Sequence, residues 1–110
     1  MPFHTYIYQT QIELTQEQAG QLDMGEEIEA LAASVRLELP AQPGLVSALE
    51  MHSFDDDAPV RVIFQSIWES WSDLRRHLDS GLNAQRMLEE WGEGYLTKPP
   101  ESQVFRQIGV

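Results

Sequence analysis

The chain has 110 residues, 42% of them hydrophobic, and its 18 acidic residues against 7 basic ones give a formal charge of −11. This length and this apolar content predict a single domain over residues 1–110 with one modest core. So large a negative charge repels phosphate backbones and anionic lipid surfaces, which argues against nucleic acid and membranes as partners.

The chain contains no cysteine. A disulfide framework, a thiolate nucleophile, an iron–sulfur cluster and a cysteine-based zinc site are therefore excluded. No apolar run approaches the roughly 20 residues that a membrane span requires, and Met1 to His4 lack a basic region followed by an apolar one. We expect a cytoplasmic protein.

The first predicted element is a strand over residues 5–14 with two unlike faces. The more apolar face carries five alternate residues, Tyr6, Tyr8, Thr10, Ile12 and Leu14. Apolar residues then recur at helical spacing between residues 15 and 44, until the Pro43-Gly44 pair ends the helical region. Two start signals compete there, and both have the spacing of a capping box: Thr15 with Gln18, and Asp23 with Glu26.

Residues 45–54 and 60–68 are predicted as the two strands of an antiparallel hairpin, joined by an acidic turn. The second of these strands is apolar on both faces, with Val62, Phe64 and Trp68 on one side and Ile63 and Ile67 on the other. Two helices cover only one face of a sheet, so the second face requires a partner. We therefore expect a homodimer in which two sheets meet.

The remainder of the chain is predicted as two helical stretches and a last strand. Ser70, three residues before Asp73, supplies a cap for a helix that Ser80-Gly81 breaks or bends. A further helical turn carries Met87, Leu88 and Trp91, and residues 101–110 form the last strand. The order β-α-β-β-α-β is the signature of a ferredoxin-like α+β sandwich with an antiparallel sheet.

Three short motifs resemble the antibiotic biosynthesis monooxygenase family. They are Pro43-Gly44 before the second strand, Trp68-Glu69-Ser70 at the end of the third, and His77 nine residues after the tryptophan. The motifs span residues 43–80, and the element order extends the resemblance over most of the chain. The family implies a ferredoxin-like fold that dimerises into an α/β barrel.

The resemblance also implies a reaction. Some members of the family oxidise anthrones or quinols with molecular oxygen and without metal or flavin, and for this chain the resemblance therefore implies no cofactor. In that branch the deprotonated substrate supplies the electrons, so the protein provides an apolar pocket and hydrogen bonds. A dimeric barrel that binds a small hydrophobic ligand or another protein without catalysis is the alternative, because one fold hosts many functions.

The haem-degrading branch of the family is a further alternative. It relies on an asparagine on the first strand, a second tryptophan and a more distant histidine. These positions align near Thr10, at His77 and at Met87, so none of the three residues is kept.

His77 and Trp68 are the candidate catalytic residues. His77 borders the apolar stripe of its helix, and histidine changes its charge near neutrality, so it could act as a base or hydrogen-bond donor to a phenolic substrate; it could equally cap a carbonyl. Trp68 is either a wall of the pocket or core packing. Glu69 and Ser70 are interpreted as turn and cap residues.

The candidate substrate-binding residues carry hydroxyl groups: Tyr6, Tyr8 and Thr10, which share one face of the first strand, and Ser66, which shares the face of Trp68. They would be the polar points of an otherwise apolar cavity, or they simply reflect amphipathic strand packing. His52 with Asp55 and Asp57 could hold a divalent ion. A run of aspartates in a hairpin turn is far more often a solvated loop, so no metal site is predicted.

Overall fold

The computed structural model describes residues 4–21, 42–53, 59–80 and 83–108. Its elements, in chain order, are β1 (His4–Leu14), α1 (Gln16–Gln21), β2 (Leu45–His52), β3 (Val60–Trp68), α3 (Trp71–Asp79), α4 (Ala84–Trp91) and β4 (Glu101–Ile108). The strands form one sheet in the order β2-β3-β1-β4, and every neighbouring pair is antiparallel. This arrangement confirms the predicted ferredoxin-like α+β fold.

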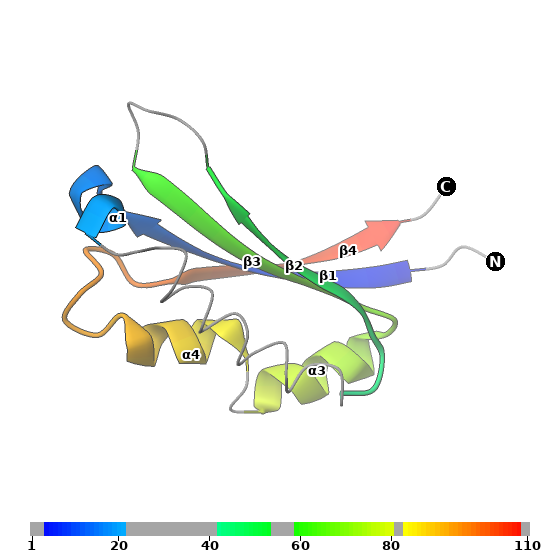
Figure 1. The fold of residues 1–110 in the computed structure, drawn as a ribbon. Helices are drawn as coiled ribbons and strands as arrows, with labels where there is room; N and C mark the ends of the chain where they lie inside the picture. Colours follow the sequence, from blue (N-terminus) through cyan, green and yellow to red (C-terminus); the bar gives the residue numbers. More distant parts are fainter. Residues whose placement is uncertain (1–3, 22–41, 54–58, 81–82, 109–110) are drawn as a thin grey trace.

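The core lies between the sheet and the two helices α3 and α4, which cover the same face (Figure 1). One cluster of buried residues consists of Ile12, Leu14, Val62 and Leu88, and a second consists of Tyr8, Trp68 and Leu74. The alternation of side chains along a strand explains this selection, because the buried residues of β1 and β3 all have the same parity. The predicted faces of both strands are therefore confirmed.

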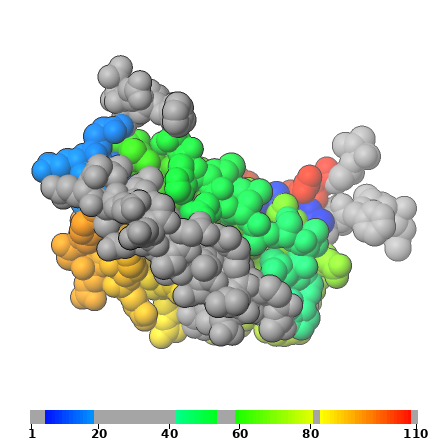
Figure 2. All heavy atoms as spheres, in the orientation of Figure 1, coloured from blue at the N-terminus to red at the C-terminus, as the bar shows by residue number. Residues whose placement is uncertain are grey.

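The opposite face of the sheet, here called the open face, carries none of the described helices (Figure 1). Leu49 and Met51 of β2 are 44% and 40% exposed on this face, and Phe105 of β4 is 44% exposed. In the space-filling view, residues of β2 lie at the surface of the molecule, while α4 lies at its lower margin (Figure 2). None of the described elements thus covers the second apolar side of β3.

Local signals in the sequence explain where the helices begin. Thr15 and Gln18 form a reciprocal capping box, in which each backbone N–H donates to the side-chain oxygen of the other residue at 2.9 and 3.0 Å. The second predicted box, Asp23 with Glu26, lies outside the described residues. Asn83 caps α4 by accepting from the backbone N–H of Arg86 at 3.0 Å.

Helix α3 begins and ends at the residues predicted for it. The hydroxyl of Ser70 accepts from the backbone N–H of Asp73 at 3.1 Å, and Ser80 is the C-cap. Trp71, its first residue, is 45% exposed, and the ring lies 5.9 Å from that of Tyr6. Strand β2 ends at His52, before the predicted Phe54.

Candidate functional site

The sequence-predicted site residues lie on the helix-covered side of the sheet. The register pairs Tyr6 with Trp68, and Tyr8 with Ser66, so these four side chains share one face. Thr10 follows on the same face of β1 and is fully buried. Helix α3 brings His77 down onto this face, and it too is buried.

Trp68 and His77 form the centre of the site. Their rings are stacked, with centroids 4.6 Å apart and planes inclined by 28°. The indole N–H of Trp68 donates to the hydroxyl of Ser66 at 2.8 Å, which satisfies the only polar group of a completely buried side chain. The ring of Tyr8 approaches His77 edge-on at 6.0 Å. Two aromatic rings, those of Trp68 and Tyr8, therefore contact the imidazole on its sheet side.

His77 is a neutral hydrogen-bonding group in this position. It is 3% exposed, and desolvation by burial lowers the pKa of its imidazole from 6.5 to about 4. Its Nδ1 lies 2.7 Å from Oε1 of Gln42. Because an amide oxygen only accepts, the imidazole carries its proton on Nδ1, and Nε2 keeps its lone pair. The ring can accept a hydrogen bond from a hydroxyl group but holds a proton only weakly at neutral pH.

The hydroxyl of Tyr8 connects β1 with α4 and β4. It accepts from the backbone N–H of Gln85 at 3.1 Å and lies 3.3 Å from the hydroxyl of Ser102 and 3.5 Å from Oδ1 of Asn83. The hydroxyl of Thr10 lies 2.8 Å from that of Ser102, so it joins the same network. Thr10 and Tyr8 therefore form a second polar group of the site, anchored on the first turn of α4.

Tyr6 is placed apart from these contacts. It is half-buried, and its ring contacts Trp71 rather than His77.

Four residues of the site, Gln42, Asn83, Gln85 and Ser102, were not predicted from the sequence. Asn83 carried a recognisable signal, because an asparagine before an apolar helical pattern is a typical N-cap. Gln42 carried none, since its contact with His77 depends on how the turn before β2 folds over α3.

That turn is held in place by the motif residues themselves. Gly44 has φ +83°, and a Cβ at this position would collide with the side chain of Asp73. The same Asp73 receives a 2.7 Å hydrogen bond from the hydroxyl of Ser70. The Pro-Gly turn thus packs directly against the first turn of α3, and Gln42, two residues earlier, reaches His77 on the same helix.

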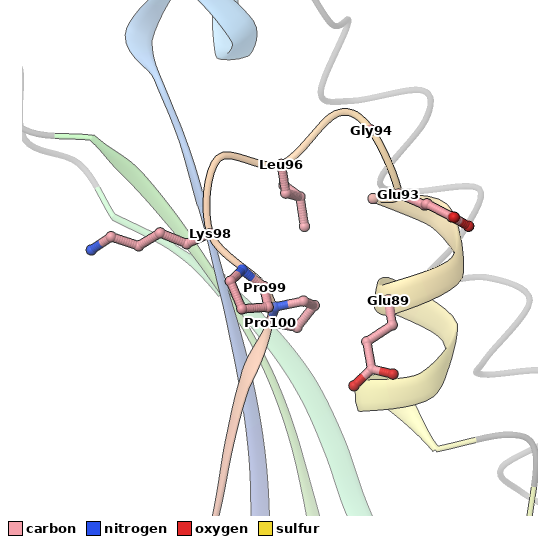
Figure 3. A pocket seen from close by; sticks show the side chains of 8 residues that line it. Glu89, Glu93, Gly94, Leu96, Lys98, Pro99 and Pro100 are labelled. Atoms are coloured by element: carbon pink, nitrogen blue, oxygen red, sulfur yellow. The ribbon is translucent and has the colours of Figure 1, made fainter.

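Other possible sites on the described residues are less developed. No group of three histidine, aspartate or glutamate side chains suited to a metal ion occurs among them. His52 contacts Glu50 at 3.1 Å, while Asp55 and Asp57 lie outside the described ranges. A hollow of about 240 Å³ lies between the end of α4 and the loop that follows it (Figure 3). It is lined by Leu96, Pro99 and Pro100 among others, and by none of the predicted site residues.

Comparison with solved structures identifies proteins of the same fold. A protein from Nitrosomonas europaea, provisionally named an antibiotic biosynthesis monooxygenase, superposes with a TM-score of 0.64 at 12% identity, over 97% of this chain and 92% of that one. The ActVA-Orf6 monooxygenase of Streptomyces coelicolor, solved with the ligand nanaomycin D, gives 0.63 at 18% identity, over 96% and 88%. A Mycobacterium tuberculosis protein gives 0.65 at 17%, over 92% of each chain.

The chain therefore has the fold of the antibiotic biosynthesis monooxygenases, and the resemblance seen in the sequence is confirmed at the level of the fold. No family model matches the sequence, and no curated protein matches it. Within the described ranges, no helix is long and apolar enough to cross a membrane.

Proposed function

We propose that the chain is a cofactor-independent monooxygenase that oxidises a small aromatic polyketide or quinol with molecular oxygen. The observation that carries the proposal is the stack of Trp68 on a buried, neutral His77, with the hydroxyls of Tyr8, Thr10 and Ser66 on the same side of the sheet. An aromatic wall with a few polar groups suits a flat oxygenated molecule. The nanaomycin D complex of a protein with the same fold supports this substrate class.

In the proposed reaction the substrate supplies the electrons. An anthrone methylene reacts with O₂ so that the carbon keeps one oxygen atom as a carbonyl, while its two hydrogens leave with the other atom as water. The reaction begins when a phenol or enol loses its proton, because the resulting anion reduces oxygen. The Nε2 lone pair of His77 takes that proton as the general base. Because the ring holds a proton only weakly, it passes the proton on to the reduced oxygen, and the apolar surroundings protect the intermediate from water.

Oxygen consumption with a panel of anthrones and hydroquinones tests this proposal. His77→Ala should lower the rate by about 100-fold, the scale of a lost proton-transfer partner. Trp68→Phe should raise KM, because it keeps an aromatic wall but removes the indole. His52→Ala, which changes an exposed histidine on β2, is the matched control and should keep the wild-type rate. Equal rates in the His77→Ala and wild-type proteins, with both folded by circular dichroism, contradict the proposal.

A homodimer is the second part of the proposal. The open face of the sheet exposes Leu49, Met51 and Phe105. Val104 and Ile108 of β4 are also exposed, but they lie on the opposite face of the sheet. An apolar surface that runs across the sheet is typical of an interface. A second copy would cover it and, with a twofold axis, meet the same residues. A monomer by light scattering at micromolar concentration would contradict this part.

A non-catalytic dimeric barrel is the second candidate function, and the packing of Trp68 favours it. This indole is completely buried, and its one polar group is satisfied by Ser66. Such a side chain can be part of the hydrophobic core without forming the wall of a substrate pocket. Saturable binding of an aromatic ligand without oxygen consumption across the whole panel would support this candidate over the oxygenase.

A further inference from the structure

Within the described ranges, the side-chain amide of Gln42 has one hydrogen-bond partner, although it could have several. Its Oε1 accepts from Nδ1 of His77 at 2.7 Å. Its Nε2 is buried, and it has no hydrogen-bond partner among the residues that the structure describes. The residue stands in the turn before β2, and that turn is fixed by the contact of Gly44 with Asp73.

A buried amide nitrogen without a partner is costly. Leaving such a donor unsatisfied costs on the order of 1–3 kcal/mol, and folded proteins rarely retain one without a reason. This donor lies on a side chain that directly contacts the imidazole stacked on Trp68. The position is next to the aromatic wall of the proposed site, where an acceptor oxygen of a bound molecule would satisfy it.

The two ends of the amide have complementary effects on the site. Through Oε1, Gln42 requires a proton on Nδ1 of His77 and so leaves Nε2 of the ring as an acceptor. Through Nε2, it offers a donor. A site with one fixed acceptor and one fixed donor favours a molecule that carries both a hydroxyl group and a carbonyl or phenolate oxygen over an unoxygenated aromatic of the same size.

We propose that Gln42 is a positioning and specificity-determining residue, which holds His77 in its Nδ1–H tautomer and donates from Nε2 to a carbonyl or phenolate oxygen of the bound aromatic molecule. The donor role rests on the proposed function, because it requires an aromatic ligand in this site. The tautomer role does not, since it is a property of the free protein.

Two variants separate these roles. Gln42→Glu keeps an acceptor for the Nδ1 proton but removes the donor, whereas Gln42→Met removes both at similar volume. Gln18→Met is the matched control. That glutamine uses both amide atoms, with Oε1 accepting from Thr15 and Nε2 donating to the carbonyl of Tyr95, so its loss lowers stability without touching His77.

Two measurements on the full chain test the proposal. Long-range ¹H–¹⁵N NMR of His77 should show the Nδ1–H tautomer in the wild type, Gln42→Glu and Gln18→Met, and a mixture in Gln42→Met. Titration of nanaomycin D, followed by tryptophan fluorescence, should show a Kd raised about tenfold or more in both Gln42 variants, the scale of one lost buried hydrogen bond, and unchanged in Gln18→Met.

Three results overturn the inference. An Nε2–H tautomer in the wild type removes the positioning role. Wild-type affinity in both Gln42 variants removes the donor role while the proposed function stands. A wild-type chain that binds neither nanaomycin D nor any anthrone or hydroquinone of the panel overturns the proposed function and the donor role together, and the NMR result then decides the positioning role alone.

Discussion

The carbonyl oxygen of Gly44 accepts a 2.8 Å hydrogen bond from the backbone N–H of Glu69, which joins the turn before β2 to the end of β3. This bond brings together two motifs that lie 25 residues apart in the sequence. The bond fixes the position of the turn relative to α3, which begins two residues after Glu69, and so helps to place Gln42 beside His77.

Replacing Gly44 should be among the most damaging changes in the turn. Gly44→Ala adds a Cβ at φ +83° and against the side chain of Asp73, so we expect a loss of about 2–4 kcal/mol from backbone strain and overpacking together. Gly94→Ala is the control, because Gly94 has φ +74° but open space around it, and should cost only about 1 kcal/mol. Chemical denaturation measures both, and equal losses would show that the contact with Asp73 has no effect.

The burial of His77 should make stability depend on pH. Its pKa is about 4 in the folded protein and 6.5 unfolded, so the unfolded chain binds more protons between these values. The stability contributed by the neutral ring is complete above pH 6.5 and is lost as the pH falls toward 4, by about 2 kcal/mol at pH 5. Urea denaturation at pH 7 and pH 5 should show a smaller difference for His77→Gln than for the wild type. An unchanged difference in His77→Gln would contradict the assignment.

Ser66 should stabilise the fold through the indole of Trp68. Ser66→Ala leaves a buried indole N–H without its acceptor, and we expect a loss of about 1–3 kcal/mol. In a Trp68→Phe background the same change should cost clearly less, because no donor remains. Denaturation of the two single variants and the double variant gives the coupling energy. Ser47→Ala, on the exposed face of β2, controls for the loss of a hydroxyl, and additive effects at Ser66 and Trp68 would exclude the interaction.

A charge on the open sheet face should separate the proposed dimer. Leu49→Glu places a carboxylate among the exposed apolar side chains of β2, and burying it against a second copy would be unfavourable. Light scattering should report a monomer for this variant and a dimer for the wild type. Thr97→Glu adds the same charge to an exposed loop and should remain dimeric. If Leu49→Glu is a dimer like the wild type, the interface must lie elsewhere on the surface.

Much of the architecture could be predicted because it depends on local rules. Alternation along β1 and β3 assigns their buried faces without knowledge of the partner strand, and Ser70 and Thr15 act on backbone groups three residues away. Strand parity likewise predicts that Ser66 and Trp68 share a face. These relationships survive folding because each is determined within a few residues of chain.

The contacts that define the site chemically are of another kind. Gln42 meets His77 across 35 positions, and Tyr8 meets Gln85 across 77. Each depends on how a turn or a helix is placed over the sheet, which no periodicity encodes. The lowered pKa of His77 follows from the same placement, since it is caused by burial.

The open face of the sheet has a consequence for how two copies would behave in different buffers. Each copy carries a formal charge of −11, so the apolar attraction between two sheets acts against long-range repulsion. The Debye length falls from about 30 Å at 0.01 M salt to about 8 Å at physiological ionic strength. Added salt should therefore tighten the association rather than loosen it, and dilution of the protein into low-salt buffer would be the mildest way to obtain single copies.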